Sequence, residues 1–563
     1  MFKSPRTGEP RNFYCCEWWC MGLWLSNGSI DCVGSPNVKS PLPAFMASLA
    51  RPMRVARGGL AKAAWPIASR LAKSMGHVDP GKLPQPPKAQ VVDVKADVLV
   101  VGGGLSGLAT AYELSRLGLR VALVEANGWL GGRWIEVGAR VNGVDVGQYV
   151  KDIEGKLKEH GAELHLGVVF DGFFEDAAIG HSLDYSRLLK FNYRYLILAT
   201  GSREVPLIFP NNYQVPMYTG LTYVKMLKAG KAPRDALIYG SDEWGLAVAD
   251  AVKGLGVEPL IIDSSMAPRH NAVIKAKAMF GIYIVDAYRE GGRFRLRYVT
   301  PQGPKKLTEG ELTGEALVTT IRAPSYELAA QLNVEVVYEH SLGGFVPRHS
   351  WVGELHGANN VFVVGEASGL IPLGLIPMQA RVTALYIGLR EGLATSQDFD
   401  RAIEEFRRSL YTTNAAVADA FNRLEKGLHE VGYFQEPNVP EVPQWPSDLY
   451  AMDKAHRQLV CYCSDVTLGD LLEAYLIFSG LGKIKVRLIH EEAPRYRELR
   501  PPSMEYLKRA TGIGTGGCQG KLCLTSAALI LARVLQRKPR EIGLPRQRPP
   551  TSPIPIGLLA QGD

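Results

Sequence analysis

The segment ADVLVVGGGLSGLATAYELSRLGLRVALVEA, residues 96–126, decides the fold of this chain. An apolar strand at 98–101 runs into the glycine motif of 102–107, a helical pattern follows, and a second strand at 121–124 ends on Glu125. Glycines at this spacing allow a tight turn, a close approach to a pyrophosphate, and close packing of helix on strand. The helix N-terminus attracts phosphates, and the acid can bind an adenosine ribose. We therefore expect an adenine-nucleotide site formed by Gly102, Gly104, Leu105, Ser106, Gly107, Glu125 and Ala126.

Two later strands complete a recognisable pattern. YLILATGSREVP (195–206) and NNVFVVGEASGL (359–370) each carry an apolar strand into a short glycine motif. They resemble the closing motifs of flavoproteins with two dinucleotide-binding domains, in which an insertion splits the FAD domain. That class usually has Asp where Glu366 stands, and the acid bonds the ribityl chain of the flavin. The resemblance, which a Gly-Gly-Arg motif after the ribose acid also fits, adds Gly132, Arg133, Ala199, Thr200, Gly201, Gly365 and Glu366 to the expected cofactor site.

The inserted segment DALIYGSDEWGLAVADAVKGLGVEPLIIDSS (235–265) repeats the strand, turn, helix and strand. Asp263 follows Gly240 by the same interval that separates Glu125 from Gly102. Asp242, however, replaces the central glycine, and a carboxylate there repels a pyrophosphate. We expect an NAD-type fold that does not bind NAD(P)H. Disulfide-reductase chemistry is excluded as well, because residues 33–460 contain no cysteine.

The cysteines gather at the two ends of the chain, at Cys15, Cys16, Cys20, Cys32, Cys461, Cys463, Cys518 and Cys523. The last four form a C-x-C and a C-x4-C pair, and the second pair lies in the glycine-rich TGIGTGGCQGKLC (511–523). Four thiolates fit either zinc or a [2Fe–2S] cluster. Zinc knuckles usually use C-x2-C, and glycine N–H groups can face bridging sulfides, so the pattern favours the cluster over zinc or unliganded thiols. Thr467 and Asp470 predict a capped helix after the first pair.

The order of split flavin domain, helical linker and four-cysteine domain resembles the α subunits of heteromeric amine and amino-acid dehydrogenases. This family includes the α chains of sarcosine oxidase and dye-linked proline dehydrogenase, the A chain of opine oxidase and the B chain of hydrogen cyanide synthase. The resemblance covers about 96–540, and its last part is similar to bacterioferritin-associated ferredoxin. It implies that a flavoprotein β subunit oxidises the substrate and that this chain carries the electrons away. It also implies an FMN at the subunit interface and a small ferredoxin-like protein as a further partner.

The N-terminal region resembles a ferredoxin-like module that has lost ligands. Cys15 and Cys20 match a C-x4-C-x2-C pattern, but Leu23 and Pro41 stand at its third and fourth positions. We expect a degenerate module without a cluster, with a second cluster built on Cys16 and Cys32 as the alternative.

Charge is concentrated in the same region. Of the net +8, all lies in residues 1–92, which hold twelve Lys/Arg and four Asp/Glu. The basic segment at 51–73 suits a linker helix, or contact with an acidic partner or a membrane surface. It lacks interleaved aromatic residues for nucleic acid, and no run of about 18 apolar residues predicts a membrane span. Cysteine usage favours a reducing cytoplasm.

These patterns predict an α/β chain of seven parts. They are a degenerate ferredoxin-like module (1–45), a basic linker (46–94), a split FAD-type domain (95–210 and 325–398), an inserted NAD-type domain (211–324), a helical linker (399–452), a [2Fe–2S] domain (453–540) and a Pro-rich tail (541–563). The expected function is an electron-transfer subunit of an amine or amino-acid oxidoreductase. The alternatives are an NAD(P)H-dependent flavin reductase and a scaffold that binds an adenine nucleotide. Sequence alone leaves FAD, NAD and ATP open at the first site.

The segment PLGLIPMQARVTA (372–384) follows the second closing motif and bears on where the substrate is oxidised. It is apolar apart from Gln379 and Arg381. We expect the stretch at 371–378 to be a surface for a partner or for a shared flavin. Arg381 is a less favoured candidate for holding a substrate carboxylate, and the catalytic residues remain unknown.

Overall fold

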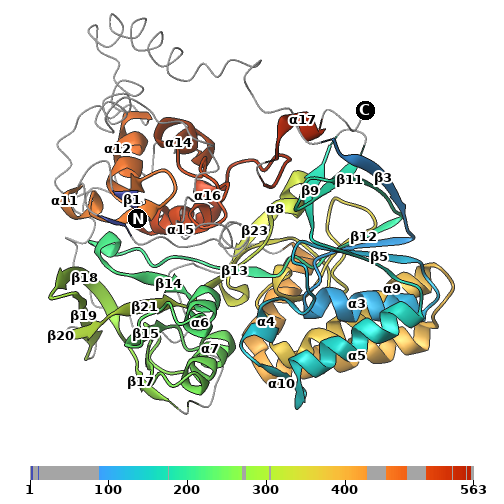
Figure 1. The fold of residues 1–563 in the computed structure, drawn as a ribbon, viewed down its shortest axis with the longest axis horizontal. Helices are drawn as coiled ribbons and strands as arrows, with labels where there is room; N and C mark the ends of the chain where they lie inside the picture. Colours follow the sequence, from blue (N-terminus) through green and yellow to red (C-terminus); the bar gives the residue numbers. More distant parts are fainter. Residues whose placement is uncertain are drawn as a thin grey trace, which may run out of the picture.

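The computed structural model describes residues 2–3, 10–11, 88–174, 177–268, 274, 276–302, 306–427, 452–478, 503–535, 537–552 and 554–559. The expected ferredoxin-like module, with Cys15, Cys16, Cys20 and Cys32, lies almost entirely outside these residues, as does most of the basic linker. Figure 1 shows two parallel sheets with helices packed on them and a helical C-terminal unit above. Among the described residues, no helix is both long enough and apolar enough to cross a bilayer.

The first sheet has five strands, all parallel. In spatial order they are β25 (Val361–Val363), β12 (Tyr195–Leu198), β4 (Val98–Val101), β5 (Val121–Glu125) and β8 (Glu163–Leu166). Strands of a sheet covered on both faces are apolar throughout, and β4 reads Val-Leu-Val-Val. Val98 and Val100 face helices α3 (Leu105–Arg116), α5 (Val146–Glu159) and α9 (Ile376–Arg390), whereas Leu99 and Val101 face a second, smaller sheet.

That smaller sheet covers the opposite face of the first one. Its strands, in spatial order, are β3 (Gln90–Lys95), β11 (Arg187–Asn192), β10 (Ala178–Ser182) and β9 (Val168–Phe173). Val94 and Phe170 from this sheet pack against Leu99 and Val101 of β4. The first parallel sheet is therefore buried between a layer of helices and a layer of strands.

The second parallel sheet is built from the segment between β12 and β25. Its strands, in spatial order, are β14 (Met217–Thr219), β21 (Ala316–Thr319), β15 (Ala236–Tyr239), β16 (Leu260–Ile262) and β17 (Lys277–Met279). An antiparallel meander, β18 (Tyr283–Glu290), β19 (Arg293–Pro301) and β20 (Leu307–Gly314), is attached to it, and helices α6 (Gly220–Lys228) and α7 (Glu243–Gly254) pack nearby. The predicted fold, in which one dinucleotide-binding unit is inserted into another, is confirmed.

Short elements join these units. They are α4 (Gly132–Glu136), β6 (Arg140–Val141), β7 (Val144–Asp145), β13 (Ser202–Glu204), β22 (Arg322–Pro324), α8 (Glu327–Gln331), β23 (Val336–Glu339) and β24 (Gly344–Pro347). At the N-terminus, β1 (Phe2–Lys3) pairs with β2 (Pro10–Arg11). The two crossings between the parallel sheets, β13 and β22, pair with each other in antiparallel register. This pairing ties the first unit to the second where the chain enters and leaves the insertion.

The C-terminal unit consists of α11 (Met452–Ala455), β26 (Leu459–Cys461), β27 (Val466–Thr467), α12 (Leu468–Phe478), α14 (Met504–Thr511), α15 (Leu524–Val534) and α16 (Pro539–Ile542). Beyond it, α17 (Ile556–Leu559) packs on the smaller sheet, where Leu558 is buried with Ile179 and Leu188. The predicted cap of α12 is present, because the Thr467 N–H donates to Asp470 Oδ2 (2.8 Å) and the Asp470 N–H donates to Thr467 Oγ1 (3.2 Å). Tyr326, Tyr338 and Phe345 of the first unit pack into the core of this one. The C-terminal unit is therefore anchored on the flavin-type fold.

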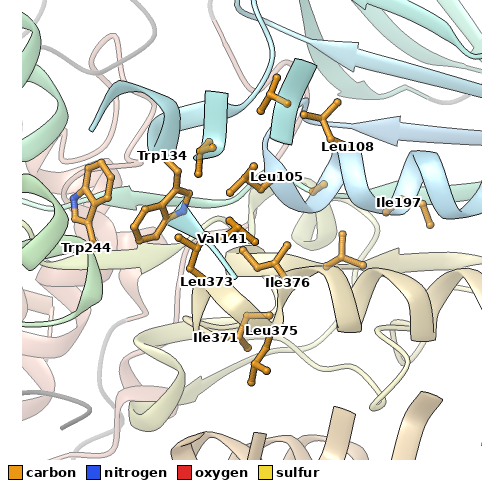
Figure 2. Packing of buried hydrophobic residues seen from close by; sticks show 14 of the residues in the cluster. Leu105, Leu108, Trp134, Val141, Ile197, Trp244, Ile371, Leu373, Leu375 and Ile376 are labelled. Atoms are coloured by element: carbon orange, nitrogen blue, oxygen red, sulfur yellow. The ribbon is translucent and has the colours of Figure 1, made fainter. Parts of the chain in front are cut away.

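The main core corrects one expectation from the sequence. Ile371, Leu373, Leu375 and Ile376 are buried in the same core as Trp134, so these four residues do not form the surface for a partner that the sequence suggested for 371–378 (Figure 2). The alternative, a surface for a flavin, stays a prediction, because Ile376 also lines a cavity. An apolar run that ends in a helix looks the same in sequence whether it faces solvent or the interior. The kinked helix α10 (Ser396–Lys426), predicted as part of a linker, packs into the same core.

Candidate functional site

The turn between β4 and α3 has the geometry that a bound pyrophosphate requires. Gly102 has a φ of +110°, and a Cβ there would lie 2.3 Å from the carbonyl oxygen of Ala199. A Cβ on Gly107 would lie 1.8 Å from the Gly102 carbonyl oxygen, so only glycine lets the helix start this close to the strand. At Gly104, by contrast, no atom lies within 4 Å of the position that a Cβ would take. Open space therefore faces the backbone where phosphates bind at a helix N-terminus.

Glu125 lies beside this turn and helps to hold it. The Gly103 N–H donates to Glu125 Oε2 (2.7 Å), and the backbone and side-chain amides of Asn127 donate to Oε1 (2.7 and 2.8 Å). Burial raises the pKa of this carboxyl above its usual range, against the lowering effect of these hydrogen bonds. A carboxylate oxygen can accept about two hydrogen bonds, so Oε1 is filled by Asn127, whereas Oε2 can accept one more besides that from Gly103. The side chain can therefore fix the turn and still accept a ribose hydroxyl.

One cavity runs along the carboxyl ends of β4, β5 and β12. It is lined by most of the predicted cofactor residues, namely Gly102, Gly104, Leu105, Ser106, Glu125, Ala126, Gly132, Arg133, Ala199, Thr200, Gly201 and Glu366. Gly107 and Gly365 do not line the cavity. They are needed because a Cβ at either position would collide with neighbouring atoms. The Gly365 N–H donates to Gln379 Oε1 (2.7 Å), and a Cβ on Gly365 would collide with Ser106 Oγ at 1.8 Å.

Glu366, the predicted flavin acid, is held in a buried network of charges. Arg322 Nη1 donates to its Oε1, Ser202 Oγ donates to its Oε2 (3.0 Å), and Arg133 Nε lies 3.9 Å from Oε2. Arg322 also donates to Asp242 Oδ2 (2.7 Å) from the second unit. The carboxylates of Asp242 and Glu366 raise the pKa of Arg322 against the effect of burial, which is the largest single influence and lowers it. The guanidinium therefore joins the two nucleotide-binding units through one ion pair on each side.

The second unit keeps the backbone geometry of a nucleotide site. Gly240 has a φ of +123°, and a Cβ on Gly245 would lie 2.2 Å from the Gly240 carbonyl oxygen, as at the first turn. Between them, Asp242 caps α7 by accepting from the Gly245 N–H (2.9 Å). A protein carboxylate therefore stands at the helix N-terminus that would otherwise receive a pyrophosphate. Asp263 is fully buried and accepts from the Ser241 N–H and hydroxyl (both 2.7 Å).

A second helix N-terminus near this place is also capped by a carboxylate. Glu204 is buried and accepts from the Gly220 and Leu221 N–H groups at the start of α6 (2.7 and 3.2 Å) and from Trp244 Nε1 (2.7 Å). The Trp244 ring packs edge-on against Trp134 at 5.1 Å (Figure 2). Glu204 was not predicted from the sequence, although an Arg-Glu pair one residue beyond the Ala-Thr-Gly motif is a visible signal. These contacts fix the position of the second unit against the first.

The four C-terminal cysteines come together in two close pairs. Cys463 Sγ lies 3.9 Å from Cys518 Sγ, and Cys461 is hydrogen-bonded to Cys523. All except Cys463 are buried. Hydrogen bonding within each pair lowers the pKa of Cys461 to about 7 and raises those of Cys463 and Cys523. Among the described residues, no group of three or more Cys, His, Asp or Glu side chains is arranged around a single metal position.

This arrangement fits a cluster in two respects. Thiolates bound about 2.3 Å from a tetrahedral metal lie roughly 3.8 Å apart, close to the observed separation of Cys463 and Cys518. The backbone N–H groups of Gly514 and Ser464 are directed at the Cys461 sulfur, and such donors stabilise a charged site. Glycine is required in the loop, because a Cβ on Gly516 would lie 2.2 Å from the Cys463 Cβ.

The cavity continues from the nucleotide turn to the cysteine loop. Its lining includes Arg203 and Ser325 of the first unit, and Cys518, Lys521 and Leu522 of the C-terminal unit. The two predicted cofactor sites therefore open on the same space. Arg381, in contrast, is exposed and does not line this cavity.

The segment after α16 forms part of the wall of the cavity. Thr551 and Ser552 line it, the Thr551 N–H donates to the Asp171 carbonyl (2.7 Å), and the Thr551 hydroxyl donates to the Phe170 carbonyl (3.1 Å). Lys521 Nζ donates to the Thr551 carbonyl. Figure 1 shows this red segment crossing from the C-terminal helices to α17, beside β3, β9 and β11. The predicted Pro-rich tail is therefore part of the site's wall where it is described.

Comparison with known proteins agrees with this architecture. The family model "Pyridine nucleotide-disulphide oxidoreductase" matches residues 96–279, and the "Sarcosine oxidase A3 domain" matches 501–563. The α chain of sarcosine oxidase from Corynebacterium sp. (strain P-1) is 24% identical over 95% of this chain and 54% of its own length. The A chain of opine oxidase from Agrobacterium tumefaciens (strain Ach5) is 22% identical over 82% of this chain and 91% of its own. The chain thus spans about half the length of the sarcosine oxidase α chains it matches.

Among solved structures, the crystal structure of L-proline dehydrogenase from P. horikoshii superposes with a TM-score of 0.56 and 20% identity. The superposition covers 84% of this chain and 81% of the other, and it shows a shared fold. The chain is therefore similar along most of its length to the α chain of sarcosine oxidase and the A chain of opine oxidase, which confirms the family resemblance predicted from its motifs.

Proposed function

We propose that this chain is the electron-transferring subunit of an oxidoreductase that acts on an amine or an amino acid. In this proposal FAD occupies the cavity, and Cys461, Cys463, Cys518 and Cys523 hold a [2Fe–2S] cluster. The observation that carries it is the single cavity lined both by the phosphate-binding turn at Gly104 and by Cys518. The names of the relatives, sarcosine oxidase and opine oxidase, supply the substrate class.

A flavin dinucleotide suits the cavity better than a mononucleotide. The lining extends past the phosphate turn and Glu125 to Arg133 and Glu366, where the sequence motifs predict the flavin half. When bound, a flavin exchanges electron pairs with organic donors and single electrons with an iron–sulfur centre. Gly104, Glu125 and the N-terminus of α3 would bind the adenosine and phosphates, and Glu366, fixed by Arg322, would accept from the ribityl hydroxyls.

A diiron cluster suits the cysteines better than one zinc ion. Each iron of a [2Fe–2S] cluster takes two thiolates, which matches the two close pairs. A structural zinc needs four ligands around one position. An FMN between subunits, a ferredoxin-like partner and a cytoplasmic location remain predictions from the sequence.

Substrate oxidation is proposed to occur on a partner flavoprotein, the β subunit, since the cavity's carboxylates are already engaged. They are Glu125 with Gly103 and Asn127, Glu136 with Lys225, Glu204 with Trp244, Glu327 with Arg203, and Glu366 with Arg322. N–H donors and cations bonded to a carboxylate lower its basicity. Glu125 is the exception, because burial raises its pKa, but its carboxylate is fixed at the phosphate turn by the Gly103 and Asn127 N–H groups. No described histidine lines the cavity. Among the described residues that line the cavity, we therefore assign none as the base that removes a proton from an amine, and we propose that they position and insulate cofactors.

The test compares the purified chain alone with the chain co-purified with its partner. The chain alone should not reduce an artificial dye with sarcosine, proline or an opine, whereas the complex should. Cys461→Ser in the complex should slow delivery of electrons to the acceptor more than it slows reduction of flavin by substrate. Turnover by the isolated chain at the rate of the complex would contradict the proposal.

A further inference from the structure

Arg203 is a buried cation at the boundary between the nucleotide cavity and the cysteine loop. It lies on β13, which pairs with β22 near the centre of the molecule (Figure 1), and its side chain is 11% exposed. The guanidinium donates to the Pro324 carbonyl (3.2 Å) and forms an ion pair with Glu327, whose side chain is 9% exposed. The proposed function assigns no role to either of these charges.

A series of contacts connects Arg203 with the residues next to the cysteines. Its guanidinium carbon lies 5.6 Å from the centre of the Tyr326 ring. Tyr326 is hydrogen-bonded to Thr525, which is in the first turn of α15 and two residues after Cys523. The Tyr326 ring packs in the same buried group as Cys461 and Cys523. A continuous buried path therefore joins Arg203 to the helix that presents a predicted cluster ligand.

Arg203 also acts on the cysteine loop through charge. It lines the same cavity as Cys518 and lies within electrostatic range of that thiol. Electrostatic interactions are stronger in a buried region than in water, because the effective dielectric constant is lower. The net charge near an iron–sulfur cluster is one of the factors that set its reduction potential.

We propose that Arg203 is a positioning residue that raises the reduction potential of the four-cysteine cluster, and that Glu327 opposes it. Reduction adds one electron to the cluster and forms no new bond, so a fixed positive charge nearby stabilises the reduced state. The bound flavin would then donate its electrons toward the cluster rather than retain them. This inference rests on the proposed function, because it requires a cluster at these cysteines.

The test measures the midpoint potential of the cluster by EPR-monitored redox titration of the full chain. Arg203→Met should lower the potential, and Glu327→Gln, which leaves the arginine uncompensated, should raise it. Arg203→Lys should stay near the wild type because it retains the charge. Opposite shifts from the two partners are the decisive feature, since loss of packing alone would not move the potential in opposite directions.

The matched control is Arg423→Met, which breaks another partly buried ion pair, between Arg423 and Glu339 (2.6 and 2.8 Å). It should leave the potential unchanged. If Arg203→Met and Glu327→Gln retain full iron with unshifted potentials, or shift in the same direction, the inference is wrong and the proposed function stands. A wild-type chain without iron would instead contradict the proposed function, and this inference with it.

Discussion

Asp242 places a carboxylate at the N-terminus of α7 without disturbing the glycine turn before it. The carboxylate caps α7 and pairs with Arg322, so the second unit carries its own anion where a nicotinamide dinucleotide would place phosphates. Glu204 likewise places a carboxylate at a helix N-terminus, that of α6, where it accepts from the Gly220 N–H. The backbone of the turn survives because Gly240 and Gly245 still allow the close packing of helix on strand.

The first prediction at this scale concerns Asp242. Millimolar NADH or NADPH should fail to bleach the flavin of the native protein, followed by absorbance under anaerobic conditions. Asp242→Gly removes both the charge and the side chain, and it should permit measurable NADH binding. It also leaves buried Arg322 with Glu366 as its remaining carboxylate, so the variant should be less stable than the native protein. Asp242→Asn keeps the cap, and it serves as the control for loss of charge alone. Rapid bleaching of the native flavin by NADH would refute this interpretation.

Glu125 carries the second prediction. Glu125→Ala removes a ribose acceptor and also frees the Gly103 N–H, so the adenine nucleotide retained per folded chain should fall. A lost hydrogen bond to a charged group is worth about 1.5–3 kcal/mol, or roughly 10-fold or more in affinity. The measurement is the nucleotide released by denaturation, quantified by chromatography. Asp263→Asn, at the matching position of the second unit, should leave the content unchanged, and equal loss in both variants would contradict the assignment.

At the scale of elements, the pattern of apolar residues predicted the strands of the first sheet closely. The expected strands at 98–101 and 121–124 correspond to β4 and β5, because glycine turns and charged residues mark their ends. The capping box of α12 was equally visible, since it is a contact between neighbours in sequence. Features of this kind depend on residues that are close in sequence, so they can be predicted from the sequence alone.

Contacts between distant segments could not be predicted in the same way. Arg322 reaches Asp242 and Glu366 across 80 and 44 residues, and Thr551 bonds Phe170 across 381. The periodic pattern of apolar residues does not indicate which distant residues will form such pairs. The partner surface predicted at 371–378 was wrong for its buried residues for a related reason, since Leu373 and Ile376 pack into a core that forms only when the units assemble.

The cysteine loop between α14 and α15 carries the third prediction. Cys518→Ser or Cys523→Ser should remove the iron, because a serine oxygen is a hard ligand that binds iron of a sulfide cluster poorly. Iron and sulfide analysis after anaerobic purification measures this. Cys20→Ser, in the N-terminal region predicted to hold no cluster, is the matched control and should retain full iron. One zinc per chain with no iron in the native protein would overturn the cluster assignment.

At the scale of the whole molecule, three units share one cavity. The first parallel sheet supplies the phosphate turn, the inserted unit is fixed by Trp244 and Arg322, and the C-terminal unit contributes Cys518 and the segment at 551–552. If FAD and a [2Fe–2S] cluster occupy the sites proposed for them, this arrangement places the two redox groups on one cavity. That geometry suits the proposed electron-transfer role.

An anaerobic reductive titration of the purified chain with dithionite, followed by absorbance and EPR, tests whether the chain holds both redox groups. A flavin accepts two electrons and a [2Fe–2S] cluster one, so we expect an end point of about three electrons per chain. Bleaching of the flavin should accompany the appearance of the reduced-cluster signal. An end point of about two electrons without that signal, or no reducible group at all, would contradict the central claim.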